Sequence, residues 1–354
     1  MKITHVIESS ATGTLAVVLM LANNQVNDGH QVSVIYSVRP DTPEELPSMF
    51  DKRIYIQKCD MSIKKAVFSI AELRRIITII NPDIIHLHSS VAGFVGRLAC
   101  LFLSNVKIFY SPHCISFMRK DISLTKKKLF IALEKLAGCK HAAYIACSQS
   151  EFDAIKKCIP GSQVFIVNNA YDGNIHHVVE STAIEKNRKT IVTVGGIRRQ
   201  KDPMLFSEIA KRYKSSNYDF VWIGDGDEKY KRELSASSVN ITGWMGKDEL
   251  LKFIRNSDLY LSCSTWEGMP ISILEAMANG LPVVASNCTG NKDIINHKKN
   301  GYLFDSIDEA CMFIDEVFND NSRSRELINN SLDDIQKLFS VNVFLKNIYS
   351  IYDK

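Results

Sequence analysis

Two glutamates with seven residues between them, Glu267 and Glu275, stand in a stretch that predicts a strand end, a loop, a helix, a tight turn and a second strand over 264–286. Pro270 suits the first turn of the helix, where a missing N–H costs nothing. Gly280 suits the left-handed residue just past the helix end. The stretch therefore predicts a rigid unit that presents two carboxylates around the start of a helix.

This unit combines groups that bind anions with groups that bind hydroxyls. The N–H groups near Ile271 and Ser272, at the helix start, would attract a phosphate. Glu267 lies in the loop beside a glycine that lets a ligand approach the backbone, and Glu275 leans back toward the helix N-terminus. A nucleotide sugar is a ligand whose phosphates would bind the backbone amides and whose hydroxyl groups would bind the carboxylates. The alternative is a solvated loop glutamate and a surface helix glutamate.

A second candidate is the loop 194–203, which places two glycines and three cations between a predicted strand and a predicted helix. Such a loop neutralises a diphosphate leaving group as its bond to the sugar breaks. Lys201 is the first candidate cation because it lies nearest the helix start, and Arg198 is the second. The alternative is a solvated basic turn.

The pattern Gly224-Asp225-Gly226 begins like a dinucleotide-binding fingerprint, but Lys229 stands where the third glycine should be. Acidic residues crowd the same loop and would repel a pyrophosphate. We interpret it as a tight turn between a strand and a helix.

The first half of the chain offers a glycine and three histidines. Gly13 lies between the first strand and the first helix, where either a ligand contact or the turn itself would require glycine. His86 and His88 alternate along a strand and so point to one face; no further metal ligands are evident at matching positions, and we expect a structural role. His113 follows a strand end, where the side chain would face a cleft, and a functional and a structural role are equally open.

The segment 117–140 carries seven basic and two acidic residues, a net charge of +5, with leucines and other apolar residues interleaved. A basic amphipathic helix of this kind suits an anionic membrane surface or a diphosphate-linked lipid. An ordinary surface helix with a solvated basic face is the alternative.

Alternating strand-like and helix-like segments position these candidates and predict two doubly wound α/β domains of similar size, with ligands at the carboxyl ends of the strands across a cleft. The expected divisions are a first domain, a polar linker, a second domain and a final helix that crosses back: 1–172, 173–189, 190–338 and 339–354.

Length and composition limit the number of domains, the class of binding partner and the location of the protein. The chain has 354 residues, more than a typical single core, and a formal charge of +4, too small to argue for nucleic-acid binding. Nine cysteines without a C-x-x-C pair favour reduced thiols. The first residues predict a strand and no signal peptide, and no run reaches the length of a membrane span. We therefore expect a cytoplasmic protein that contacts a membrane.

The residues W-E-G-M-P-I-S-I-L-E-A-M-A-N-G-L-P-V-V-A-S resemble the E-x7-E signature of the family 4 retaining glycosyltransferases, which have the GT-B fold of two Rossmann-like domains facing across a cleft. The loop G-G-I-R-R-Q-K-D-P resembles the diphosphate loop of that family. Similar segments occur at 84–96, 111–113, 146–151 and 167–169, so the resemblance covers essentially the whole chain.

The resemblance implies a role for each matching position. Glu275 would hold the ribose hydroxyls, Glu267 would face the donor sugar, and His113 would lie beside the anomeric carbon. The backbone around Met245 would hold the base. The implied catalytic residues are His113, Glu267 and Lys201, and the implied donor-binding residues are Gly13, Arg198, Met245, Gly268, Met269, Pro270, Ile271, Ser272 and Glu275.

Two positions depart from the family pattern. Gly196 stands where the family commonly has Arg, so that Arg198, Arg199 or the acceptor side would have to supply the charge. The first loop has Thr12-Gly13 in place of paired glycines. Both departures concern contacts to the diphosphate.

The function implied is transfer of a hexose, with retention, from a UDP-linked donor to a lipid-diphosphate-linked saccharide in bacterial O-antigen, capsule or exopolysaccharide synthesis. No metal and no cofactor are implied, and the membrane partner would be the inner face of the cytoplasmic membrane, reached through 117–140. A nucleotide-sugar epimerase of the same fold and a non-catalytic sugar- or lipid-binding module are the alternatives.

Overall fold

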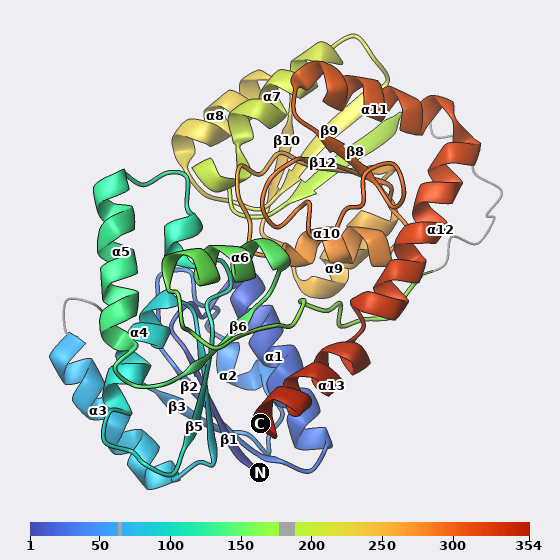
Figure 1. Ribbon diagram of the computed structural model, residues 1–354. Helices are drawn as coiled ribbons and strands as arrows, with labels where there is room; N and C mark the ends of the chain where they lie inside the picture. The colour runs from blue at the N-terminus through green and yellow to red at the C-terminus, as the bar shows by residue number, and fades with distance from the viewer. Residues whose placement is uncertain (63–65, 177–187) are drawn as a thin grey trace. The chain divides into compact units, whose positions relative to one another are not determined.

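The computed structural model forms two compact α/β units (Figure 1). The first unit comprises Met1–Asn169 with Phe344–Lys354, and the second comprises Ala170–Val343. The structure describes residues 1–62, 66–176 and 188–354. Much of the predicted linker 173–189 therefore lies outside the described residues.

The first unit is built on a parallel sheet of seven strands in the order β3-β2-β1-β4-β5-β6-β7. Its strands are β1 Lys2–Ile7, β2 Gln31–Tyr36, β3 Tyr55–Lys58, β4 Ile84–His88, β5 Lys107–Ser111, β6 Ala143–Ala146 and β7 Val164–Ile166. Its helices are α1 Thr12–Asn27, α2 Leu46–Met49, α3 Ala66–Ile80, α4 Ser90–Ala99, α5 Leu124–Ala137 and α6 Gln149–Cys158, with α13 Val341–Tyr352 near the C-terminus. The predicted alternation is confirmed, and the short α2 in the proline-containing loop was not expected.

Strand β4 shows how the two faces of this sheet differ. Ile85 and Leu87 pack into a hydrophobic core with α3 and α4. His86 and His88 are buried on the opposite face, where α1 and α13 lie (Figure 1). Because side chains alternate along a strand, the predicted common direction of the two histidines is confirmed.

Helix α13 closes this second face. The Tyr349 hydroxyl donates to Asp28 Oδ2 over 2.6 Å, and the Lys107 ammonium donates to the Tyr352 carbonyl over 3.0 Å. Phe344 and Ile348 are buried. The C-terminal helix is thus part of the first unit.

The second unit contains a parallel sheet of six strands in the order β10-β9-β8-β11-β12-β13. Its strands are β8 Lys189–Val194, β9 Tyr218–Ile223, β10 Asn240–Gly243, β11 Leu259–Ser262, β12 Val283–Ser286 and β13 Tyr302–Phe304. Its helices are α7 Pro203–Arg212, α8 Glu228–Ala236, α9 Lys247–Arg255, α10 Ile271–Ala278, α11 Ile307–Asn319 and α12 Asn321–Leu338. Nearly continuous apolar strands, buried on both faces, are what a parallel sheet covered by helices requires.

Candidate active site

The predicted signature unit folds as β11, a buried loop, α10, a tight turn and β12. Gly280 has φ 74° just past the helix, as predicted. Pro270 is the residue that precedes α10, with φ −72° and ψ 117°, so its predicted position in the first helical turn was wrong by one step. No side chain caps the first turn of α10 among the described residues, and its amides retain the direction that favours an anion.

Lys201 and Glu267 form an ion pair in this unit, with Lys201 Nζ 2.9 Å from Glu267 Oε1. The pair is held by neutral donors on the same carboxylate: Ser264 Oγ donates over 2.8 Å and Gln200 Nε2 over 3.0 Å. Both charged side chains are about nine-tenths buried. Two residues that the sequence singled out from separate motifs are therefore in direct contact.

Local backbone geometry places Lys201. Residues Arg199–Lys201 form a 3-10 turn, and Asp202, with φ 48°, precedes Pro203 at the start of α7 and accepts from the Leu205 N–H. A Cβ on Gly195 would come within 2.8 Å of Lys201 Cε. Glycine at 195 thus makes room for the lysine stem.

Charge balance keeps Lys201 protonated. Burial alone would lower the pKa of the ammonium, but the charge of Glu267, together with Tyr260 and the hydrogen bond to Glu267, raises it above its ordinary value. A buried ion pair persists only with good geometry and satisfied hydrogen bonds, and both conditions hold here.

Glu275 lies near this pair and is only partly ionised at neutral pH. Burial raises the pKa of its carboxyl to about 7, although Lys247 and Lys201 oppose the shift. The residue is half-buried on α10. A carboxyl with this pKa changes charge in the physiological range.

Of the remaining donor-binding candidates in the second unit, Gly268, Met269 and Pro270 are buried, and Ile271 and Ser272 are half-buried. Ser272 Oγ accepts from the Tyr260 hydroxyl over 2.8 Å. Met245 is half-buried, after Gly243 with φ 78°. The roles of these residues remain predictions.

In the first unit, Gly13 is exposed in the first turn of α1. His113 follows β5 in a left-handed conformation, with φ 53°, and Cys114 follows it with φ 87°. Burial lowers the pKa of His113 to about 4, so its ring is neutral at physiological pH. Two successive left-handed residues that are not glycine need surroundings that hold them.

Two family models match the chain: "Glycosyltransferase Family 4" over residues 11–174 and "Glycosyl transferases group 1" over residues 174–333. The chain belongs to the family 4 glycosyltransferases. Together the two models span both units, and the predicted GT-B architecture is confirmed.

Relatives and solved structures agree with this membership. The glycosyltransferase is 26% identical to the Escherichia coli UDP-Gal:alpha-D-GlcNAc-diphosphoundecaprenol alpha-1,3-galactosyltransferase, covering 70% of this chain and 68% of that one. It is 27% identical to a 41.2 kDa protein in the cps region of Klebsiella pneumoniae, covering 86% of each. The crystal structure of Anabaena Alr3699/HepE in complex with UDP and glucose has a TM-score of 0.84 and 17% identity, covering 100% of this chain and 99% of that one.

The family's expected Arg is replaced by Gly196 in this glycosyltransferase, and the Arg198 side chain lies next to it. An added Cβ on Gly196 would have the Arg198 side chain as its nearest neighbour, with Cδ and Nε each 3.8 Å away. Arg198 is exposed, and its charge acts on Lys201. Of the alternatives that the sequence left open, Arg198 is the residue whose side chain lies beside Gly196, and its role toward the diphosphate stays a prediction.

The loop after β9 is the tight turn that we expected. A Cβ on Gly224 would lie 2.2 Å from the Gly195 carbonyl oxygen, and one on Gly226 would lie 2.3 Å from that of Ile197. The two glycines are therefore required by close contact with the Lys201 loop.

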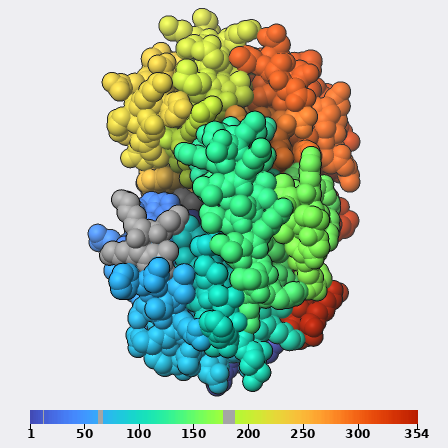
Figure 2. Space-filling model, turned by 60° about the vertical axis from the view of Figure 1, so that its left-hand side comes forward, coloured from blue at the N-terminus to red at the C-terminus, as the bar shows by residue number. Residues whose placement is uncertain are grey.

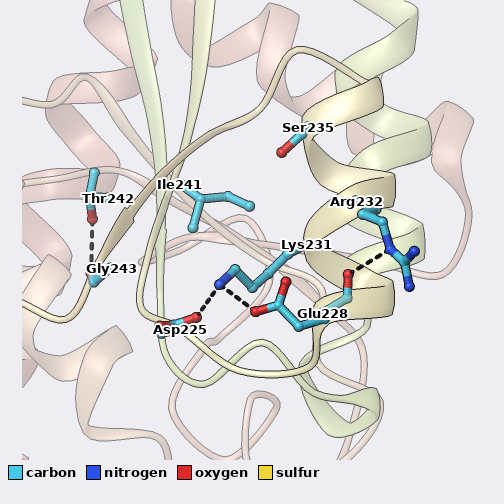
Figure 3. Close-up of a pocket in the computed structure, with 8 residues that line it drawn as sticks. All are labelled: Asp225, Glu228, Lys231, Arg232, Ser235, Ile241, Thr242 and Gly243. Atoms are coloured by element: carbon cyan, nitrogen blue, oxygen red, sulfur yellow. Dashed lines mark hydrogen bonds and ion pairs between the residues drawn. The ribbon is translucent and has the colours of Figure 1, made fainter.

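A separate open cavity of about 450 Å³ lies beside α8 and β10 (Figure 3). In Figure 3, Lys231 reaches between Asp225 and Glu228, at 2.8 Å from each carboxylate. None of the predicted site residues lines it. The charged groups of Asp225, Glu228 and Lys231 pair with one another, and we assign the cavity no part in the site.

Glu151 is a residue that sequence reasoning missed. Its buried carboxylate accepts from the Cys114 and Ile115 N–H groups, over 2.8 and 2.7 Å, and from the Cys147 N–H over 2.9 Å. It therefore holds the left-handed turn at His113 to the loop after β6. The sequence offered two signals, the family-like segment 146–151 and the helix-start pattern of Ser148 followed by Glu151, and neither reveals the distant partners.

His5, His86 and His88 form a buried cluster whose nitrogens lie within 4.8 Å of one another, a spacing compatible with a metal. His86 bonds to the Tyr352 hydroxyl over 2.7 Å and to Ser111 Oγ over 2.8 Å. The other two bond to each other and to further side chains. In the sequence no further ligand for His86 and His88 was evident, and His5, brought beside them by the pairing of β1 with β4, is the residue that sequence reasoning missed. Each ring nitrogen of the three already has a hydrogen-bond partner.

Proposed function

We propose that this glycosyltransferase moves a hexose, with retention, from a UDP-linked donor to a lipid-diphosphate-linked saccharide. The observation that carries the donor half is the Lys201–Glu267 pair beside the α10 N-terminus. Amides and an ammonium suit the diphosphate, and the two glutamates suit hydroxyls. UDP bound to Alr3699/HepE, which shares the fold, supports the choice of nucleotide.

In this proposal the protein positions the donor and stabilises the charge of the leaving group. Lys201 and Arg198 neutralise the departing diphosphate, which can itself take the proton of the acceptor hydroxyl. Glu275 holds the ribose, and His113 contacts the donor sugar. We assign the chemistry no metal and no cofactor, because the cationic side chains supply the neutralising charge.

The acceptor half of the proposal depends on a relative and on a surface. The E. coli relative is named for a diphosphoundecaprenol-linked sugar acceptor, and the K. pneumoniae relative for the cps region. Helix α5, teal to green in Figure 2, lies at the surface of the first unit. Its Leu124 is 78% exposed and its Leu136 is 60% exposed, on a helix rich in lysine.

Exposed leucines among lysines suit the interface of an anionic membrane. None of the described helices has both the length and the apolar character needed to cross a bilayer. We propose peripheral binding of residues 117–140 to the inner face of the cytoplasmic membrane, where the lipid-linked acceptor would be found.

The direct test incubates the protein with a panel of UDP-sugars, with and without an undecaprenyl-diphosphate-linked N-acetylhexosamine in detergent. We expect UDP release with one donor that is strongly accelerated by the lipid acceptor, and an α-linked product by NMR. Conversion of the UDP-sugar without any acceptor would instead indicate an epimerase. Binding without turnover under all conditions would indicate a non-catalytic module.

A further inference from the structure

A linear hydrogen-bond chain leads to His113 through the interior of the first unit. Gln25 Oε1, on α1, lies 2.7 Å from His5 Nε2. His5 Nδ1 lies 3.0 Å from His88 Nε2, and His88 Nδ1 lies 3.0 Å from His113 Nε2. Gln25, His5 and His88 are completely buried. We call these three residues the relay.

Each imidazole in this chain is neutral. Burial lowers the pKa of His5 to about 4 and that of His113 to about 4. Burial, reinforced by His86 and His5, lowers the pKa of His88 well below its ordinary value. A neutral imidazole has one nitrogen that donates and one that accepts. If one nitrogen of a ring donates, the other must therefore accept, and the role of each ring fixes the role of the next.

The direction is set at the glutamine. The Gln25 side chain turns its amide oxygen, which can only accept, toward His5 Nε2; with the amide in this orientation, His5 Nε2 carries a proton and His5 Nδ1 must accept. His88 Nε2 then donates to His5, which leaves His88 Nδ1 to accept from His113 Nε2. The remaining nitrogen, His113 Nδ1, must therefore carry a lone pair.

That nitrogen is in an uncommon situation. His113 Nδ1 is buried and has no hydrogen-bond partner among the residues that the structure describes. Buried polar atoms are nearly always paired. Since the relay makes this atom an acceptor, only a donor such as a hydroxyl group can complete it.

We propose that Gln25, His5 and His88 are positioning residues that fix the tautomer of His113, so that its Nδ1 accepts a hydrogen bond from a hydroxyl group of a sugar substrate. The identity of that substrate rests on the proposed function. A site built to pair a hydroxyl discriminates strongly against an analogue that lacks it, because the buried acceptor is then left unpaired.

His86 provides a matched control. It lies on the same strand and face as His88, is equally buried, and its ring centroid is 4.1 Å from that of His88. Its nitrogens bond to Tyr352 and Ser111 and not to any histidine of the relay. On α1, Asn24 bonds to the Met20 carbonyl and serves as the control for Gln25.

The first arm of the test is independent of activity. Long-range ¹H–¹⁵N NMR of histidine-labelled full-length protein, with His113→Gln for assignment, should show His113 protonated only on Nε2. His88→Phe and Gln25→Leu should give a mixture of the two tautomers, whereas His86→Phe and Asn24→Leu should leave the His113 tautomer unchanged. Protonation on Nδ1 in the unmodified protein, or an unchanged tautomer in Gln25→Leu, would overturn the proposal. Gln25→Leu is the milder change and covers the case in which His88→Phe does not fold.

The second arm uses the transfer reaction. His88→Phe should lower kcat about tenfold, as expected when a buried hydrogen bond to a functional group is lost. When His88→Phe is added to the His113→Gln variant, it should lower kcat little further, because the two residues act through the same contact. Donor and acceptor analogues that each lack one hydroxyl identify which sugar pairs with Nδ1. Equal losses in both backgrounds would mean a merely structural role. An absence of transfer with every donor would refute the proposed function and leave the NMR arm valid.

Discussion

The two units share one architecture, but their candidate sites hold buried polar groups in different ways. The site in the second unit buries a charged pair, Lys201 with Glu267. The site in the first unit buries uncharged imidazoles that lead to His113. Both sites lie beyond the carboxyl ends of parallel strands, the usual location in such folds.

The difference matches two kinds of ligand chemistry. A diphosphate gains charge as it leaves, and a fixed ammonium in a dry site stabilises that charge. A sugar hydroxyl is neutral and needs a partner of defined donor or acceptor character. A third region, the basic residues of α5 in the first unit, is mostly exposed and suits a surface rather than a small ligand.

Four predictions test this contrast between buried charge, buried neutral rings and exposed charge, beginning with the largest expected effect.

Lys201→Ala should lower kcat about 100- to 1,000-fold, the usual loss when a group that stabilises the developing charge is removed. Steady-state kinetics with the identified donor measures it. Lys231→Ala is the matched control, because Lys231 also pairs with carboxylates in the second unit but lies outside the site. Comparable kcat values for the two variants would show that the charged pair has no part in the chemistry.

Replacing Lys126, Lys127 and Lys128 by Glu should weaken binding to vesicles rich in anionic phosphatidylglycerol by at least about 100-fold, given roughly 1 kcal/mol for each basic residue near the surface. Flotation or surface plasmon resonance measures the affinity. UDP binding should not change, since these residues belong to the first unit. Unchanged vesicle affinity would leave α5 an ordinary solvated helix.

Donor affinity should fall about tenfold between pH 8 and pH 6, because the pKa of Glu275 is raised to about 7 and its ionised form is the better acceptor for ribose hydroxyls. Calorimetry with the donor measures this. Glu275→Gln should bind more weakly at pH 8 and show a flat profile. The same shift predicts that the contribution of Glu275 to stability declines as the pH rises from 4.5 to about 7, since burial favours the protonated carboxyl.

Glu151→Gln should lower kcat several-fold, because an amide NH₂ replaces one of the carboxylate oxygens that hold the His113 turn, at a cost of about 1–3 kcal/mol. Kinetics and thermal unfolding should be measured together. Glu134→Gln is the control: it perturbs the buried pair with Arg97 and should lower stability without lowering the kcat of the folded protein. A Glu151 variant that is only less stable would have no positioning role.

Much of the fold could be predicted because its signals are local. The alternation of strand-like and helix-like segments predicted both parallel sheets. The left-handed conformation of Gly280 followed from the rule for helix ends, and the common direction of the two β4 histidines followed from the alternation of side chains along a strand. The error at Pro270 arose because a residue type can be compatible with two neighbouring positions at the start of a helix. Pro270 suits both the residue before a helix and its first turn, and the structure places it at the former.

Sequence by itself determined which residues could meet the diphosphate and the sugar, because the signature, the Lys201 loop and the strand ends are each defined within a few consecutive residues. Only the tertiary structure decided that Lys201 pairs with Glu267, that Glu151 holds the His113 turn and that Gln25 sets the direction of the relay. Those contacts join residues far apart in the chain. They exist because the order of strands brings β8 beside β11, β5 beside β6, and β1 beside β4, and that order depends on packing whole helices onto the sheet rather than on any local pattern.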